Sequence, residues 1–243
     1  MRRCACISVV ILLILSVGLQ SFKRVGAKPA TLTVPDDFST IQEAINNAID
    51  GDTVFVKAGT YYEHVVVNKA LMLVGEDVTT TIIDGNETGR VISITSDNVS
   101  ITGFTVQGGG GTMVPELDAG IYLSSTSHCN IHGNRLLENY VGIIGSTKNA
   151  TMSNNTIANN HVGIDIHEAT CNIISGNRLA ANNVSIHIYY ADSNSVFKNN
   201  ITDNQLRAIV VGYSKNNRFY HNNFLNNTEQ IVMLASGWTN SRA

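Results

Sequence analysis

The stretch that decides the fold is GIDIHEATCNIISGNRLAANNV, residues 163–184, because variants of it recur on both sides along the chain. Four further segments align with it, at residues 120–141, 142–162, 185–207 and 208–230. Self-similarity at a fixed short period is typical of stacked repeats. The leading apolar residues are Ile121, Ile143, Ile164, Ile186 and Ile209, with Ile231 opening a sixth segment, at spacings of 22, 21, 22, 23 and 22 residues.

Within each segment, short apolar strands alternate with polar turns. In the quoted stretch Ile164 and Ile166 belong to one strand, Ile173 to a second and Leu179 to a third. These runs are too short and too broken for the helices of ankyrin or tetratricopeptide repeats. We therefore expect an all-β, right-handed parallel β-helix with a repeat of about 22 residues and about eight coils over residues 53–234.

Asparagine occupies two recurring positions in these segments. Its side chain tolerates left-handed turn conformations, and identical amides stacked about 4.8 Å apart can pass hydrogen bonds from coil to coil. We therefore interpret these asparagines as structural turn ladders. The first predicted ladder contains Asn134, Asn155, Asn177, Asn200 and Asn223, and the second contains Asn139, Asn160, Asn182, Asn204 and Asn226.

The segment before the repeats, residues 31–84, has a different pattern. Ser39 and Gln42 have the spacing of a capping box, and Gly51 is placed to end a helix. We expect an N-terminal α-helix that caps the first coil, because an uncapped stack exposes strand edges and its apolar end. The apolar stripe at helical spacing consists of Ile41, Ala44, Ile45, Ala48 and Ile49.

The N-terminus has the pattern of a secretory leader, with Arg2 and Arg3 before an apolar run at residues 7–19. An uncleaved anchor is the alternative, and no later segment is apolar enough to span a membrane. We therefore expect a secreted, extracellular or cell-surface protein. The expected boundaries are a signal peptide at 1–27 and a single β-helix domain at 28–243, with the cap and early coils in 28–106, a loop at Gly108–Ala119 and regular repeats in 120–234.

The net charge and the cysteine positions argue against two features, a nucleic-acid partner and an intramolecular disulfide. Removal of the leader leaves 12 basic residues against 19 acidic ones, a net charge of −7, which argues against nucleic acid as a partner. Cys129 and Cys171 lie two coils apart with Ala150 between them, so their separation is about 9.6 Å. We expect no disulfide between them, because a disulfide needs Cα atoms within about 7 Å.

Glycosylation sequons, which suit a secreted surface, begin at Asn86, Asn98, Asn149, Asn154, Asn183, Asn200 and Asn226.

The opening VPDDFSTIQEAINNAIDGDTVFVKAGTYYEHVVVNKALMLVGED, residues 34–77, is followed by repeats with NNTI, GNRL and GI motifs. This combination resembles the NosD-like right-handed β-helix proteins of the pectin-lyase-like superfamily, whose repeat is called the carbohydrate-binding and sugar-hydrolase (CASH) domain. The resemblance covers nearly all of the chain after the leader and implies a secreted or surface protein. The family name comes from copper-enzyme maturation. The resemblance implies the fold more than the chemistry, since one scaffold hosts many functions.

Catalytic motifs of related enzymes are missing. GTYYE resembles an element near the start of pectin methylesterases, but no QAVA, QDT, DFIFG or GRPW segment follows, and the NTD, GHG and RIK segments of polygalacturonases are also absent. Asp165 and Glu168 share a coil, yet no carboxylate matches them on the neighbouring coils, which argues against a calcium cluster or a two-carboxylate glycosidase site. We expect no catalytic residues, no metal site and no cofactor.

The best candidate site lies on one strand ladder. Asp165 and His167 must point outward, because the isoleucines beside them point into the core, and His187 and Tyr189 take the matching places one coil later. Two imidazoles, a carboxylate and an aromatic ring can bind a sugar ring or a divalent metal, or can simply face solvent. If this face has a ligand, we expect these four residues to contact it, with the Gly108–Ala119 loop as a rim. Tyr122 and Tyr213 are expected to flank the same face.

Three classes of function follow from these observations. A non-catalytic surface module that binds a polysaccharide, another glycan or a protein partner is favoured by the missing catalytic motifs. A polysaccharide-cleaving lyase or hydrolase needs an acid or base pair across coils that the motifs do not reveal. A copper-handling accessory needs clustered soft ligands. The methionines are instead scattered, at Met72, Met113, Met152 and Met233.

Overall fold

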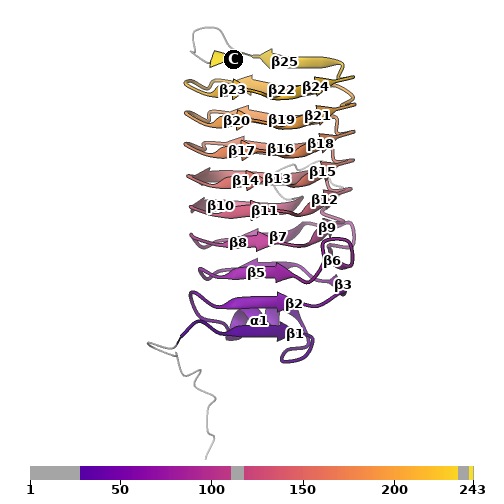
Figure 1. The fold of residues 1–243 in the computed structure, drawn as a ribbon, viewed down its shortest axis with the longest axis vertical. Coiled ribbons are helices and arrows are strands. Elements are labelled where there is room, and N and C mark those ends of the chain that lie inside the picture. The colour runs from indigo at the N-terminus through magenta and orange to yellow at the C-terminus, as the bar shows by residue number, and fades with distance from the viewer. Residues whose placement is uncertain (1–27, 111–117, 235–240, 243) are drawn as a thin grey trace, which may run out of the picture.

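The computed structural model describes residues 28–110, 118–234 and 241–242, with side chains only up to residue 234. The predicted leader, Met113 and most of the predicted loop therefore lie outside the described residues. The chain forms a parallel β-solenoid of about nine turns, close to the predicted eight. Figure 1 shows the coils stacked along one axis, with the helix at the N-terminal end.

Three parallel sheets form the walls of the solenoid, and each turn of the chain visits them in the order A, B, C. Sheet A contains β1 (Thr31–Val34), β2 (Thr53–Val56), β5 (Met72–Gly75), β8 (Ser100–Thr102), β11 (Asn130–His132), β14 (Thr151–Ser153), β17 (Ile173–Ser175), β20 (Ser195–Phe197), β23 (Arg218–Tyr220) and β26 (Ser241–Arg242). Sheet B contains β3 (Gly59–Tyr62), β6 (Thr81–Asp84), β9 (Thr105–Gln107), β12 (Arg135–Leu137), β15 (Thr156–Ala158), β18 (Arg178–Ala180), β21 (Asn200–Thr202) and β24 (Asn223–Leu225). Sheet C contains β4 (Val65–Val67), β7 (Arg90–Ile94), β10 (Ala119–Ser127), β13 (Val141–Lys148), β16 (Val162–His167), β19 (Val184–Tyr189), β22 (Arg207–Gly212) and β25 (Glu229–Met233).

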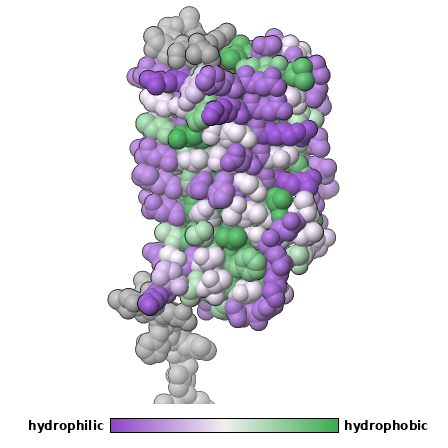
Figure 2. Space-filling view, in the orientation of Figure 1, coloured by the Kyte–Doolittle hydropathy of each residue, from purple (hydrophilic) through white to green (hydrophobic). Residues whose placement is uncertain are grey.

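The leading isoleucines of the repeats form one inward column of sheet C, which confirms the predicted register. Ile164 pairs with Ile143 on one side and with Ile186 on the other. The first five of the leading isoleucines are fully buried in a continuous apolar core that runs along the solenoid axis, and Ile231 packs against it partly buried. The outside is mainly polar, and Figure 2 shows hydrophobic residues on one face as small separate groups among hydrophilic ones.

The asparagine ladders are present, but they lie inside the coil and their later members differ from the prediction. In the ladder between sheets A and B, Asn199 and Asn222 stand where Asn200 and Asn223 were predicted. In the ladder between sheets B and C, Asn227 stands where Asn226 was predicted. Asn200, Asn223 and Asn226 lie on the exposed surface instead. A third ladder, not predicted, lies between sheets C and A. Its members are Asn172, Asn194 and Asn217.

The backbone conformation explains this shift by one residue. At each short turn the exposed residue takes a left-handed conformation, as Lys198 does at φ 55°, and the residue after it turns its side chain inward. In Lys198-Asn199-Asn200 the middle residue is therefore the ladder member. Each inward amide then hydrogen-bonds to backbone and side-chain groups of adjacent coils, as Asn199 does with Ile174 O (2.9 Å) and Asn222 Oδ1 (2.9 Å).

The predicted cap helix is present as α1 (Ile41–Asn47), which packs Ile41, Ala44 and Ile45 against the first coil. Its N-cap is Thr40 and not Ser39, because the Thr40 hydroxyl accepts the Glu43 N–H at 3.1 Å. The helix ends before Ala48, two residues earlier than the apolar stripe predicted.

Two side chains from the solenoid hold the ends of this helix. Glu63 accepts the N–H groups of Ile41 and Gln42, each at 3.0 Å, so a carboxylate lies at the positive end of the helix. The Lys69 ammonium donates to the carbonyls of Ile45, Asn46 and Ala48 at 2.6–2.8 Å and so satisfies groups that the helix leaves unpaired. The cap is therefore fixed by polar contacts as well as by its apolar face.

Cys129 and Cys171 form no disulfide, as predicted. The two cysteines were predicted to hold equivalent positions in their coils, and this is true only to within one residue. The hydrogen bonds between coils place Cys129, Ala150 and Asn172 in one column along the solenoid. Cys171 therefore lies one residue earlier, at an exposed left-handed turn with φ 59°. Over the part of the chain that the structure describes, no helix is long and apolar enough to cross a membrane.

Candidate functional site

The outer face of sheet C carries the predicted polar ladder. Asp165 pairs with His187, and His167 pairs with Tyr189, across the β16–β19 strand pair. All four side chains are partly exposed, because the residues between them fill the core. The alternation of the strand and the repeat length together bring these residues side by side.

Asp165 and His187 interact directly. His187 Nδ1 lies 3.1 Å from Asp165 Oδ1, so the imidazole carries a proton on Nδ1 and donates it to the carboxylate. The His187 side chain is 29% exposed and the Asp165 side chain is 18% exposed. The carboxylate fixes the tautomer and orientation of the ring, as second partners of functional histidines do.

Three tyrosines and His187 form an aromatic surface beside this pair. We call Tyr189, Tyr190 and Tyr213 the tyrosine cluster. Tyr189 stacks on His187 with ring centroids 5.6 Å apart and meets Tyr190 and Tyr213 edge to face at 4.6 and 5.2 Å. Tyr190 and Tyr213 stack on each other at 5.0 Å and remain 54% and 42% exposed. Tyr190 was not predicted, although its spacing of 23 residues from Tyr213 is a repeat signal.

Tyr190 and Tyr213 share the left-handed backbone that the other short turns of the solenoid also have. Both have positive φ, at 48° and 49°, in the turn that follows a sheet C strand. Glu168 takes the same place one coil before Tyr190, at φ 49°. The turn geometry therefore leaves both tyrosines exposed in two successive coils.

The environment of Tyr189 shifts its titration. Partial desolvation, followed by the neighbouring Tyr190 and Tyr213 hydroxyls, raises the pKa of the Tyr189 phenol above its ordinary value. The Tyr189 hydroxyl is therefore neutral at neutral pH. A neutral hydroxyl beside ring edges and faces suits contact with sugars more than with ions.

The predicted flanking residue Tyr122 is separated from this surface. It lies in the same column as Asp165 but two coils away, with the buried Ile144 between them. The Arg90 guanidinium lies 3.5 Å from the centroid of the Tyr122 ring, in a cation–π contact. One face of the Tyr122 ring is therefore covered by Arg90, and the candidate surface consists of residues from the later coils.

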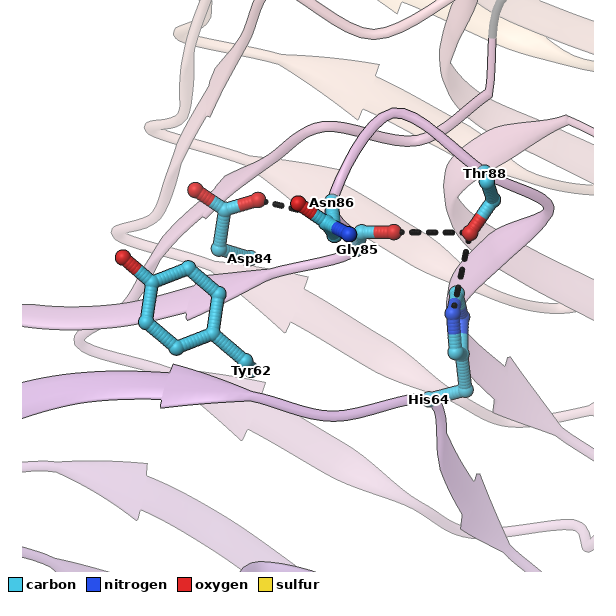
Figure 3. A pocket seen from close by; sticks show the side chains of 6 residues that line it. All are labelled: Tyr62, His64, Asp84, Gly85, Asn86 and Thr88. Carbon is cyan, nitrogen blue, oxygen red and sulfur yellow. Dashed lines mark hydrogen bonds between the residues drawn. The ribbon is translucent and has the colours of Figure 1, made fainter.

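A concave feature lies near the N-terminal end, where sheet B passes into sheet C. It is a hollow of about 350 Å³ lined by Tyr62, His64, Asp84, Gly85, Asn86 and Thr88 (Figure 3). Tyr62 is 71% exposed beside it. Sequence reasoning did not identify this hollow, because its walls come from two consecutive coils and only the sequon at Asn86 marks it.

Metal ligands are not clustered in the described parts of the chain. No group of three or more His, Cys, Asp or Glu side chains there is close enough to hold a metal ion. The soft donors are also dispersed: Met152 is buried in the core, whereas Met72 and Met233 lie on separate exposed surfaces.

Comparisons with known proteins agree with this architecture. The chain is similar to the cell surface glycoprotein of Methanothermus fervidus, at 31% identity over 119 residues, which is 48% of this chain and 18% of that protein. Among solved structures it is similar to the Dettilon tailspike protein (TM-score 0.63, 13% identity, 85% of this chain and 47% of that one) and to an alginate lyase of a Paenibacillus species (TM-score 0.56, 14% identity, 87% and 98%). At these identities the two structures show the fold alone.

A family model described as periplasmic copper-binding protein (NosD) matches residues 45–242. This match covers the solenoid from the second half of the cap helix onward, including all the regular repeats. The chain therefore belongs to the NosD family of parallel β-helix proteins.

Proposed function

We propose that this protein is a surface-exposed, non-catalytic β-helix module that binds a polysaccharide across the later coils of sheet C. The observation that carries the proposal is the tyrosine cluster beside the Asp165–His187 pair. Aromatic rings supply rigid apolar area with polar tips, and the imidazole and carboxylate supply hydrogen-bonding groups for sugar hydroxyls.

The repeat geometry favours an extended ligand. Parallel strands place equivalent side chains about 4.8 Å apart along the axis, so a polymer can contact several coils at once. His187, Tyr189 and Tyr213 come from two successive coils, and their mutual contacts hold them before any ligand arrives. Such preorganisation lowers the entropic cost of binding.

Location outside the cytoplasm supports this function. The similar protein from Methanothermus fervidus is a cell surface glycoprotein, and the family description is periplasmic. The chain spans about a fifth of the length of that relative. Any binding partner of this chain in a larger surface assembly is therefore also a proposal. A surface location also agrees with the predicted leader and the seven sequons.

A polysaccharide-cleaving activity is the second candidate, because an imidazole oriented by a carboxylate can act as a general base. Against it, Asp165 has Ile144 and His187 as its neighbours in the ladder and not a second carboxylate. A two-carboxylate hydrolysis therefore lacks its partner on this column.

Copper handling does not fit the residues present. Copper(I) requires clustered thiolate, thioether or imidazole ligands, whereas those donors are dispersed in the described parts of the chain.

The test compares two double variants on a glycan array and then by calorimetry with a neutral polysaccharide that binds. The His187→Ala/Tyr189→Ala variant should lose tenfold or more in affinity, about 1 to 3 kcal/mol, with its thermal midpoint kept. The control, Phe197→Ala/Tyr220→Ala, removes a stacked aromatic pair with ring centroids 4.8 Å apart from the outer face of sheet A and should bind normally. Equal binding by both variants, or binding to no glycan, contradicts the proposal. Release of new reducing ends by the unmodified protein favours the enzyme instead.

A further inference from the structure

Seven sequons lie on the solenoid, and their surroundings differ. Most of them overlap a strand: Asn200 to Thr202 lies wholly within β21, and Ser185 of the Asn183 sequon is fully buried. Two sequons lie entirely between strands: Asn86-Glu87-Thr88 between β6 and β7, and Asn226-Asn227-Thr228 between β24 and β25. All three residues of the Asn86 sequon are exposed, whereas Asn227 is partly buried as a ladder member.

The acceptor side chain of Asn86 is free to react. Asn86 has a left-handed backbone at φ 52°, and its N–H donates to Asp84 Oδ1 at 2.8 Å, which fixes the turn. Its side-chain amide makes no hydrogen bond with any described residue. Asn183 Nδ2, in contrast, contacts His161 Nδ1 at 2.8 Å, and Asn226 Nδ2 donates to Asp203 Oδ1 at 3.1 Å.

The hollow beside Asn86 can receive a group attached to it. Figure 3 shows Asn86 between Asp84 and Thr88, with the Tyr62 ring beside Asp84 on the neighbouring coil. Tyr62 makes no ring contact with another described aromatic residue, so most of its surface faces solvent. His64 is held below Thr88 by Nδ1–H donation to Arg90 O at 2.8 Å. An aromatic platform with a carboxylate and an imidazole nearby suits a sugar.

We propose that Asn86 is an N-glycosylation site and that the first sugar of its glycan occupies the hollow against Tyr62. In this reaction Asn86 Nδ2 forms a bond to the anomeric carbon of a lipid-linked oligosaccharide. The anomeric C–O bond to the lipid diphosphate breaks, the diphosphate leaves, and the amide gives up one proton. Thr88 supplies the hydroxyl that the sequon requires.

The experiment treats the purified, folded full chain with an oligosaccharyltransferase and a polyprenyl-diphosphate-linked oligosaccharide, and measures the occupancy of each sequon by mass spectrometry. Occupancy at Asn86 should exceed that at Asn183 and Asn200 at least tenfold, and Asn86→Gln should remove it. The chemically unfolded chain is the control, in which all three peptides should be modified. An unmodified Asn86 in the folded chain, or equal modification of Asn183 and Asn200, overturns the proposal.

A second measurement tests the seating of the sugar. Glycosylation should raise the thermal midpoint by about 1–3 °C in the unmodified sequence and in Tyr62→Phe, but not in Tyr62→Ala. An equal rise in Tyr62→Ala overturns the contact with Tyr62. In cells the modification also requires the exported location proposed above. The reaction with purified protein is independent of export, so the two proposals can fail separately.

Discussion

Substituting Asn199 and Asn200 one at a time compares the contribution of a buried ladder residue to the free energy of unfolding with that of its exposed neighbour. Asn199 is 1% exposed. Its Oδ1 accepts Asn177 N and Nδ2, both at 3.0 Å, and its Nδ2 donates to Ile174 O, Phe197 O and Asn222 Oδ1 at 2.9–3.1 Å. The Asn200 side chain is exposed and accepts one hydrogen bond, from Asn223 Nδ2 at 2.8 Å.

The free energies of unfolding should differ accordingly. Asn199→Ala leaves several buried donors and acceptors without partners, and each such group costs about 1–3 kcal/mol, although some partners keep a second bond. We expect a total loss of about 3–5 kcal/mol. Asn200→Ala removes one exposed hydrogen bond and should cost about 0.5 kcal/mol or less.

Urea denaturation followed by circular dichroism measures both variants, and amide hydrogen exchange locates any local opening of the coils, which repeat proteins allow. The exchange protection of Ile174 to Asn177 and of the coil containing Asn222 should fall in Asn199→Ala only. If the two substitutions cost the same within about 1 kcal/mol, or if Asn200→Ala is the more destabilising, the inward assignment of Asn199 is wrong.

Three further outcomes follow from single residues. Ser185→Ala should raise the free energy of unfolding, measured in urea, by about 1 kcal/mol, because the fully buried Ser185 hydroxyl has no hydrogen-bond partner among the described residues. A lower free energy of unfolding would show that the hydroxyl is satisfied. Cys171→Asn should stabilise by about 0.5–1 kcal/mol, since asparagine accepts the left-handed turn better, as at Asn149, and destabilisation would contradict the turn assignment. The raised pKa of Tyr189 means that its contribution to stability is complete below pH 10 and is lost as the pH rises through the folded pKa. In an absorbance titration of the folded protein, Tyr189→Phe should therefore remove a tyrosine that ionises at higher pH than ordinary tyrosines. An unchanged signal at high pH would contradict the raised pKa of Tyr189.

The candidate site was predicted from the sequence only as far as strand alternation applies. Asp165 with His187, and His167 with Tyr189, could be paired because the repeat length sets the register and the period of two sets the outward direction. Tyr190 follows the end of β19, where the backbone turns left-handed and alternation no longer assigns a side. The covering of the Tyr122 ring by Arg90 depends on a contact between coils that the repeat pattern does not encode.

By itself the sequence determined the period, the parallel stacking and the helical cap, because these depend on the spacing of apolar residues that must share one core. Only the tertiary structure decided which asparagine of each doublet turns inward. That choice depends on which residue takes the left-handed turn and on the amides and carbonyls that the neighbouring coils offer, as Asn177 and Asn222 do for Asn199. In the first two regular repeats Cys129 and Ala150 occupy the column of the third ladder, so only the stacked coils reveal that column.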